Sequence, residues 1–465
     1  MRQDGEVVPR EISPWCEPTI TDINRLPMRP PLGASATVEQ ARRGKFLRRL
    51  SLDGRWKFRL LDSPDDVNYA LLRGATSKLG TAWRHIDVPA NWTMQDVGDH
   101  PHYTNITMPF DGPPPRLPGH NPTGIYRRSF TVPRAWQGNQ IVLHLGAADS
   151  VHLVYVNKQF VGYGTDNRLA SEYDISRFVH HGSNELAVVV VRYSAQSYVE
   201  DQDQWWMAGL HRSVFVEARS VVHVRAVSCL VDYDAATHTG TADLDIEVAF
   251  VDTPTPGVRV QTWIEDLAGR RVCEPQMLSV PHKYDERYVF QGHRVTTRLT
   301  VRSARPWSAE DPHRYRVMVK LLGPVREYTA LVTGFRRIRV EHGEIRVNDQ
   351  RITVRGVNRH DHHPERGKAV TRADMVADVV AMKQLNCNAV RTSHYPNDPT
   401  FLDLCDEYGL YVVAEANIES HAYNTSLCDD PAYLATWLAR GARIDRKSTR
   451  LNSSHVSESR MPSSA

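Results

Sequence analysis

The 465-residue sequence predicts a multidomain protein with a β-sandwich of jelly-roll type, a second β-sandwich and an α/β segment. Three observations lead to this expectation. Short segments with period-two hydrophobicity, separated by Gly, Pro and Asn, fill the chain up to about residue 218. The same pattern starts again near Arg219 and ends near Val340. Strands and helices then alternate, which is typical of a parallel sheet or barrel.

The first sandwich is predicted over residues 51–218, after a Pro- and Arg-rich stretch, residues 1–50, that we expect to form an extended arm. Strand-like segments include DGRWKFRLL, GIYRRSFTVP, IVLHLG and ELAVVVVRY. In VHLVYVNKQFVGYG the side chains alternate in character, and Asn157-Lys158 supplies the turn of a hairpin. Many short strands without a helical period favour a jelly-roll sandwich.

The second sandwich is predicted over residues 219–340. Alternating segments include VHVRAVSCLVDY, ADLDIEVAFV, RVQTWIEDL and HRYRVMVKLLG, with a PTPG turn from Pro254 to Gly257. A stretch of about a hundred residues with this pattern is long enough for a complete sandwich.

The α/β segment is predicted over residues 341–444. ITVRGVN, CNAVRTS and LYVVAEAN have the character of buried strands. Between them, Thr371 to Leu385 has apolar residues at helical spacing and starts with a capping box of Thr371 and Asp374. A second helix, PTFLDLCDEYG, is expected to end at Gly409.

Charge and composition exclude several classes of protein. With 57 basic and 54 acidic residues, the chain has no excess charge that would favour nucleic acid or an anionic membrane. The N-terminus has no apolar signal core, and no run of about eighteen apolar residues occurs. We therefore expect a soluble cytoplasmic protein that binds neither nucleic acid nor membrane. The six cysteines form no CxxC pair, and their even number would allow disulfides. Cys387 and Cys405 lie in apolar helical or strand contexts, which favours buried free thiols.

Polar clusters follow the three predicted strands of the α/β segment. They cover residues 358–363 (NRHDHH), 391–395 (RTSHY) and 415–421 (EANIESH). The carboxyl ends of the strands in a parallel barrel converge on one face, where active sites lie. Three successive clusters, each with histidine, are better explained by a site than by solvated loops.

Glu419 and His421 lie two residues apart in an extended segment, so their side chains point to the same side. They could share a magnesium ion that keeps several waters, or form an exposed ion pair, and the spacing leaves both open. A zinc site in the cluster from His360 to His363 is disfavoured, because it lacks the helical HExxH spacing.

An acidic loop in the first sandwich has two interpretations. In VEDQDQWWMAGL the acids Glu200, Asp201 and Asp203 lie beside Trp205 and Trp206. This pattern could bind sugar hydroxyls or a cation. Chemistry alone slightly favours a solvated turn over a core tryptophan.

Seven motifs, in order along the chain, resemble glycoside hydrolase family 2. They are HYTNITMP, NPTGIYRRSF, GYGTDNRLASEYD, SYVEDQDQWWMAGLHR, RGVNRHDHHPERG, AVRTSHYPNDP and YVVAEANIESH. More narrowly, they look like the lac-operon type of β-galactosidase, from about residue 24 to about residue 444. The resemblance implies a jelly-roll sugar-binding domain, an immunoglobulin-like β-sandwich and the N-terminal part of a (β/α)8 TIM barrel.

The resemblance also implies an activity. Family members of this type hydrolyse terminal β-galactose from β-galactosides such as lactose with retention, use magnesium and sodium, and assemble as homotetramers. A β-glucuronidase or another exo-glycosidase of the family is the alternative activity. A non-catalytic fragment that binds carbohydrate or complements a partner chain is the alternative of a different class.

Site residues are carried over from the matching motifs. The expected substrate contacts are Asn105, Asp203, His360, Arg391 and His394. Glu419 and His421 are the expected magnesium ligands, and Asp203 also helps to bind sodium. Asp361 stands where the family motif leads us to expect a longer acid.

No catalytic carboxylate is assigned in this chain. Retaining hydrolysis needs two carboxyl groups about 5 Å apart. In the family the acid/base belongs to an Asn-Glu pair after a later strand, and here the only such pair is Asn184-Glu185, in the first sandwich. Glu415 and Glu419 are not taken as replacements.

The last segment, residues 445–465, is polar and lacks an apolar period. We expect a disordered or non-native tail, similar to a translated sequencing adapter. The α/β segment before it holds about three of the eight strands of a barrel. The chain as given is therefore expected to be an inactive fragment.

Overall fold

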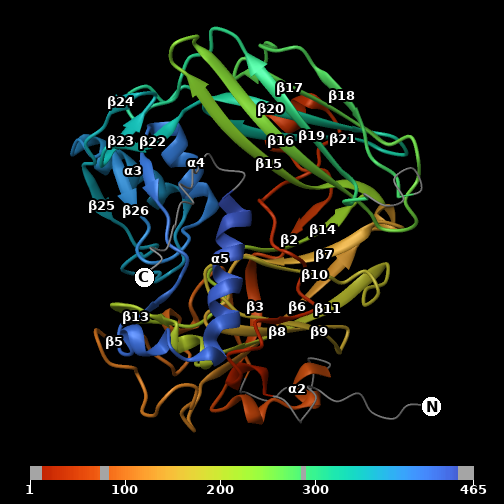
Figure 1. Ribbon diagram of the computed structural model, residues 1–465. Coiled ribbons are helices and arrows are strands. Elements are labelled where there is room, and N and C mark those ends of the chain that lie inside the picture. Colours follow the sequence, from red (N-terminus) through yellow and green to blue (C-terminus); the bar gives the residue numbers. More distant parts are fainter. Residues whose placement is uncertain (1–12, 74–82, 284–289, 449–465) are drawn as a thin grey trace.

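Two stacked β-sandwiches and an α/β part make up the molecule (Figure 1). The computed structural model describes residues 13–73, 83–283 and 290–448. The second sandwich lies above the first in this view, the α/β part lies beside them, and helix α5 passes between the parts. The predicted fold class is confirmed.

The first sandwich consists of a seven-stranded and a four-stranded antiparallel sheet. The larger has the order β1 (Asp22–Ile23), β9 (Gln159–Gly164), β8 (Val151–Val156), β11 (Gly182–Val191), β6 (Thr123–Val132), β3 (Gly54–Leu61) and β4 (Arg84–Val88). The smaller has the order β10 (Ser171–Asp174), β7 (Gln140–Leu145), β14 (Val214–Arg219) and β2 (Arg49–Ser51). Their facing side chains, including Trp56, Tyr126, Leu143 and Val188, form one buried core.

The hairpin predicted at Asn157-Lys158 connects β8 and β9. Both residues have positive φ, 47° and 73°, as a two-residue turn of type I′ requires. The Asn157 side chain also donates hydrogen bonds to the Phe178 carbonyl and to Asn184 Oδ1. Local turn chemistry therefore sets the register of this strand pair.

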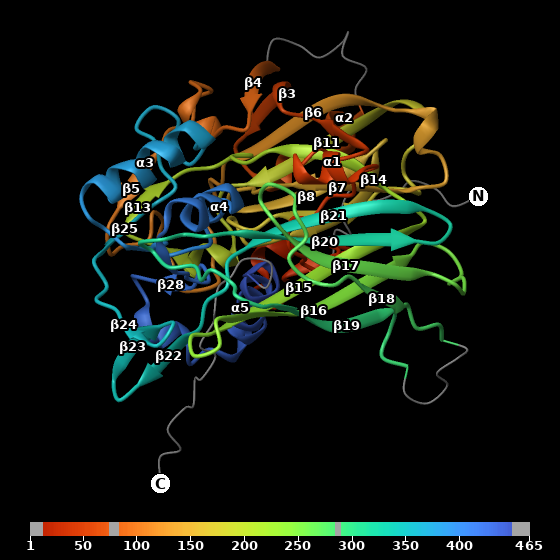
Figure 2. The same cartoon turned by 90° about the horizontal axis from the view of Figure 1, so that it is seen from above.

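The second sandwich also has two antiparallel sheets. One consists of β15 (Val222–Asp234), β16 (Thr239–Phe250) and β19 (Arg294–Val301). The other has the order β18 (Gln276–Ser279), β17 (Arg259–Asp266), β20 (Tyr315–Leu322) and β21 (Arg326–Thr333). A small three-stranded sheet of β22 (Ile338–Glu341), β23 (Glu344–Val347) and β24 (Gln350–Arg351) follows and projects at one corner (Figure 2). The predicted boundary at residue 340 falls inside β22.

The described part of the N-terminal arm, residues 13–50, is more structured than the extended arm that we expected. It contains a short 3-10 helix (Pro14–Cys16), strand β1 and helix α1 (Val38–Arg42). β1 pairs with β9, while Ser35 forms a bridge with Tyr328 of the second sandwich. The arm joins both sandwiches because its backbone groups find hydrogen-bond partners on their edges.

The α/β part contains a parallel sheet of β25 (Gly356–Asn358), β26 (Ala389–Arg391) and β27 (Tyr411–Val413). Its helices are α3 (Arg372–Gln384) and α4 (Pro399–Tyr408), which share a core with β26. Thr371 and Asp374 form the predicted capping box. All six cysteines are free thiols, as expected.

Helix α5 (Leu434–Ser448) corrects the predicted start of the tail. Residues 445–448 are helical, whereas residues 449–465 lie outside the described part of the chain. Once a helix is nucleated, each added residue gains a hydrogen bond, which favours continuation past Ile444. No helix in the described ranges, including short α2 (Tyr69–Arg73), has the length and apolar character needed to cross a membrane.

Gly409 is the residue where we expect a single methyl group to damage the packing of the α/β part. It ends α4 with φ +79°, and a Cβ would lie 2.3 Å from the Ala309 carbonyl oxygen. We expect Gly409→Ala to lower the free energy of unfolding by more than about 1 kcal/mol. Gly441→Ala in α5 is the control, because nothing lies within 4 Å of its Cβ. Urea denaturation checks both variants, and equal stability would contradict the prediction.

Candidate active site at the strand ends

The three polar clusters meet at one edge of the parallel sheet. Asn358 and Arg391 are register partners, and Arg391 is in turn the partner of Val413. The residues after these strands are therefore neighbours. The rings of His360 and His394 lie 6.1 Å apart, and His394 Nδ1 lies 2.7 Å from Glu415 Oε2.

Glu415 holds the two basic residues of the second cluster. Its Oε1 accepts a hydrogen bond from Arg391 Nε, and its Oε2 is bonded to His394 Nδ1. The other imidazole nitrogen, His394 Nε2, lies 3.5 Å from Glu419 Oε2. His394 thus bridges two carboxylates, and Glu415 acts as an orienting group.

Glu419 has the features of a cation ligand. Its Oε2 is buried and has no hydrogen-bond partner, which is unusual for a carboxylate oxygen. Burial raises the pKa of Glu419, although His394 and His421 act in the opposite direction. A hard cation with oxygen ligands would satisfy this atom.

The first sandwich holds the segment that carries Glu419. Strand β12 (Glu200–Asp201) pairs in parallel with β28 (Glu419–Ser420). The buried Asp201 carboxylate accepts a 2.6 Å hydrogen bond from the Ala422 N–H, and the Asp201 carbonyl accepts one from the His421 N–H. The candidate site is therefore built by two domains.

Asn105 reaches this site at the end of a two-stranded ribbon of the first sandwich, and Asp203 lies at the same end of the ribbon. The ribbon pairs β5 (His102–Thr104) with β13 (Gln204–Trp206). The Asn105 carbonyl lies 3.0 Å from His421 Nδ1, and Asp203 Oδ1 accepts a 2.6 Å hydrogen bond from the Tyr103 hydroxyl. The hydrogen bond to Asp203 raises the pKa of Tyr103.

The side chains predicted to bind metal ions lie at two places, the third polar cluster and the β5–β13 ribbon. Glu419 and His421 are neighbours at the site, and Glu419 Oε2 has no hydrogen-bond partner, although His394 Nε2 lies 3.5 Å from it. Across the described residues, however, no group of three His, Cys, Asp or Glu side chains could hold a metal ion. That finding also gives the rival zinc site no support. Asp203 is exposed, with the Tyr103 hydroxyl as its partner.

The first polar cluster divides into a site residue and a structural one. His360 faces His394, and its Nδ1 lies 3.2 Å from the Tyr395 hydroxyl. Burial lowers the pKa of His360 to about 4, so its imidazole is neutral at pH 7. Asp361 is fully buried and binds Arg359, Arg212 Nη2 and the Asp398 N–H. The short acid at position 361 thus connects the α/β part to the first sandwich.

Sequence reasoning missed Asn417, which anchors the third cluster. It is fully buried in the left-handed conformation, with φ +60°. Its amide donates to Asn167 Oδ1 at 2.9 Å and to Asp166 Oδ1 at 3.2 Å, and its Oδ1 accepts from Gln202 Nε2 at 2.9 Å. The one local signal was an Asn two residues before Glu419, a residue type that tolerates positive φ.

Arg440 was also missed. From α5 it donates to the Asn417 carbonyl at 2.8 Å and to Glu200 Oε1 at 2.6 Å. No local sequence pattern indicates such contacts, because they join one face of α5 to a strand of another domain. In contrast, Asn184 and Glu185 lie in β11 of the first sandwich. The Glu185 carboxylate forms an ion pair with Arg127 there and does not belong to the candidate site.

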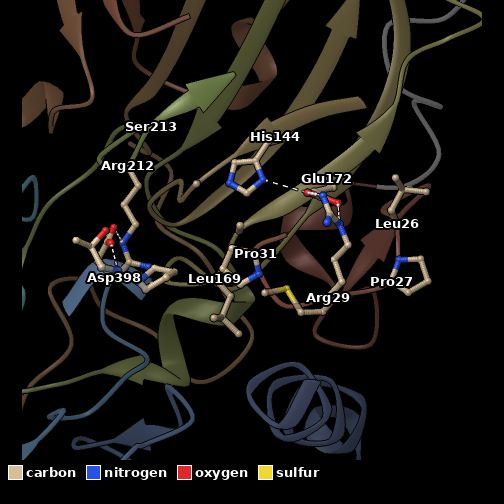
Figure 3. Close-up of a pocket in the computed structure, with 15 residues that line it drawn as sticks. Leu26, Pro27, Arg29, Pro31, His144, Leu169, Glu172, Arg212, Ser213 and Asp398 are labelled. Atoms are coloured by element: carbon tan, nitrogen blue, oxygen red, sulfur yellow. Dashed lines mark hydrogen bonds and ion pairs between the residues drawn. The ribbon is translucent and has the colours of Figure 1, made fainter. Parts of the chain in front are cut away.

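A separate cavity of about 230 Å³ lies where the arm, the first sandwich and the start of α4 meet (Figure 3). Arg29 and His144 are both bonded to Glu172, while Arg212 lies near Asp398. These charges satisfy one another, and none of the predicted site residues lines the cavity. The strand ends remain the candidate site.

Family models match two segments of the chain. The sugar-binding domain of the glycosyl hydrolases family 2 matches residues 49–219, and the TIM barrel domain of the same family matches residues 338–451. These segments contain the first sandwich and the α/β part, the two parts that build the candidate site.

Curated relatives cover almost the whole chain. A β-galactosidase of Pseudoalteromonas haloplanktis is 39% identical over 435 residues, which are 92% of this chain and 41% of the relative. A β-galactosidase of Klebsiella pneumoniae is 41% identical over 444 residues, with the same coverages of 92% and 41%. The chain thus spans about two fifths of the length of these relatives.

Solved structures agree on the fold. A β-glucuronidase of Bacteroides uniformis superposes with a TM-score of 0.70 at 21% identity, covering 87% of this chain and 46% of that one. A β-glucuronidase of Bifidobacterium dentium gives 0.70 at 20% identity, covering 87% and 66%. Since both family models match in the predicted order around a site shared by their two domains, the chain belongs to glycosyl hydrolases family 2.

Proposed function

We propose that this chain carries the sugar-binding part of a retaining β-galactosidase. The observation that carries the proposal is the joint site, in which His394 bridges Glu415 and Glu419 while the Asn105 carbonyl touches His421. Identity of 36–41% with β-galactosidases supports this substrate class.

The proposed substrate contacts are Asn105, Asp203, His360, Arg391 and His394. The neutral His360 has Nδ1 engaged with the Tyr395 hydroxyl, so Nε2 is the ring nitrogen that can exchange a hydrogen bond with a sugar hydroxyl. His394 is held in place by Glu415, so its orientation does not have to be fixed when the sugar binds. The exposed carboxylate of Asp203 can accept hydrogen bonds from sugar hydroxyls.

The local charge favours a galactoside over a glucuronide. Glu415 and Glu419 place two carboxyl groups at the site, and Asp203 adds a third on the adjoining ribbon, while the Arg391 guanidinium is already bonded to Glu415. A neutral pyranose avoids repulsion that a glucuronate carboxylate would meet. We therefore place β-glucuronidase second.

Magnesium would bind at Glu419 and His421, and sodium at Asp203. Glu419 Oε2, which has no hydrogen-bond partner, fits a hard cation. Because the Asn105 carbonyl engages His421 Nδ1, His421 would bind the cation through Nε2. A bound cation would offset part of the negative charge of the carboxylates beside the sugar, so the repulsion of a glucuronate is largest in the cation-free chain. The remaining ligands would be waters or groups other than described His, Cys, Asp and Glu side chains.

Neither reacting carboxylate is assigned to these 465 residues. Glu415 is held by Arg391 and His394, which suits an orienting role rather than attack on the sugar. A retaining enzyme needs a nucleophile and an acid/base about 5 Å apart. We expect the chain alone to bind galactosides without cleaving them.

Calorimetry and turnover assays test this proposal. We expect the chain to bind methyl β-galactoside more tightly than methyl β-glucuronide and to release no nitrophenol from nitrophenyl β-galactoside. His394→Phe should weaken galactoside binding about tenfold, since it removes hydrogen bonds at the centre of the site. His313→Phe, in the second sandwich, is the control. Preference for the glucuronide, or no effect of His394→Phe, would contradict the proposal.

A further inference from the structure

The β5–β13 ribbon presents two aromatic side chains to solvent. Tyr103 is 49% exposed and Trp205 is 45% exposed. The two residues are direct partners in the ribbon, and their ring centroids lie 5.5 Å apart with an interplanar angle of 53°. Exposed large rings held side by side are candidates for ligand contact.

The opposite face of the ribbon packs onto the first sandwich. The Trp206 carbonyl accepts a 3.3 Å hydrogen bond from Arg192 Nη2, and the Trp206 ring lies 6.3 Å from that of Tyr193. Because neighbouring residues of a strand point to opposite faces, this packing directs Tyr103 and Trp205 outward. The rings are therefore presented by an anchored ribbon.

Polar groups connect the ring pair with the candidate site. The Tyr103 hydroxyl donates to Asp203 Oδ1, and Asn105, two residues after Tyr103, contacts His421 through its carbonyl. Two residues of an extended strand span about 7 Å. A ligand that occupies the candidate site would therefore have the aromatic pair within reach of its next sugar ring.

We propose that Tyr103 and Trp205 form a platform for the sugar that is linked to the galactose. This inference rests on the proposed function and adds a second subsite to it. Aromatic faces match the C–H faces of a pyranose, and Asp203 can accept a hydrogen bond at the edge of the platform. The ligand class is a neutral β-linked disaccharide.

The size of the patch favours a sugar over a protein. The large exposed apolar side chains of this described ribbon and its flank are Tyr103, Trp205 and Ile106, the last 63% exposed. A stable protein interface buries about 800 Å² on each partner, with 20 to 30 residues. Three side chains suit one sugar ring.

Comparison of lactose with methyl β-galactoside tests the platform. We expect the chain to bind lactose about fivefold to tenfold more tightly by calorimetry, because lactose alone carries the second ring. Trp205→Ala should remove this difference and leave the affinity for methyl β-galactoside within about twofold. Trp205→Tyr should keep most of the difference, and Trp83→Phe, elsewhere in the first sandwich, is the control.

The outcomes separate the platform from the proposed function. Binding of methyl β-galactoside with no advantage for lactose, or an advantage that survives Trp205→Ala, overturns the platform alone. If Trp205→Ala abolishes binding of both sugars, the Trp205 ring belongs to the galactose subsite, and the platform proposal is also overturned. Absence of all galactoside binding overturns both proposals. A Trp205→Ala variant that loses self-association, with unchanged sugar binding, would identify the ring pair as a contact between copies.

Discussion

Replacement of Arg440 by methionine is expected to destabilise the contact between α5 and the first sandwich by about 3–5 kcal/mol. Arg440 is 2% exposed, and its guanidinium bonds to Glu200 Oε1 and to the Asn417 carbonyl. Methionine fills a similar volume but leaves the Glu200 carboxylate buried without its cation. Loss of a partner from a buried pair costs more than the pair itself contributes.

The pH dependence of this loss has a defined sign. Burial raises the pKa of Glu200 to about 7 even with Arg440 beside it. Without Arg440, Glu200 can avoid an uncompensated charge by binding a proton in the folded state. A raised folded pKa means that stability is lost as pH rises, so the deficit of Arg440→Met should be larger at pH 8 than at pH 6.

A double-mutant cycle isolates the pair. Urea denaturation at pH 8 should show that Arg440→Met combined with Glu200→Gln is more stable than Arg440→Met alone. Arg270→Met is the matched control, because Arg270 is 82% exposed and pairs with Asp266 on the surface. That variant should lose less than about 1 kcal/mol. Equal losses for the two arginine variants would refute the prediction.

Acidification below about pH 6.5 is expected to unfold the protein through its buried histidines. Burial lowers the pKa of His152 to about 3 and those of His223 and His360 to about 4, and it holds that of His211 well below its usual range. The unfolded chain binds these protons near pH 6.5, whereas the folded chain does not. Stability is therefore present above about pH 6.5 and is lost as pH falls.

The expected loss is about 1.4 kcal/mol per histidine for each pH unit below 6.5, until the folded pKa is reached. Glu200 opposes this loss of stability, because its raised pKa of about 7 lets the folded chain bind one proton that the unfolded chain does not bind in this pH range. Thermal unfolding from pH 7.5 to pH 5 would measure the slope, and His152→Gln should reduce it by about one proton. The exposed His85 provides the control substitution. A melting temperature that stays constant to pH 5 would rule out this account.

Local features of the structure followed from local sequence signals. The capping box at Thr371, the turn at Asn157-Lys158 and the helix end at Gly409 each depend on a few adjacent residues. The convergence of His394, Glu415 and Glu419 also followed, because parallel strands end at one edge.

Long-range pairings did not follow from the sequence. Asn417 and Arg440 form hydrogen bonds with side chains of the first sandwich. The sequence around neither residue indicates which residues these partners are. The arm likewise appeared extended because its few paired residues bind to strands far away in the chain. Such contacts depend on which domain faces come together, and periodicity within a segment does not encode this.

The β12–β28 pairing has a consequence for the order in which the parts of the protein fold. Asp201 and Ala422, which are bonded across it, are separated by 221 residues. During synthesis, β12 leaves the ribosome long before β28, and the whole second sandwich emerges in between. Domains generally fold as units from the N-terminus, so the first sandwich can serve as a finished template for the Glu419 segment. A substitution that slows folding of the first sandwich would therefore delay the candidate site, although the barrel strands themselves are unchanged.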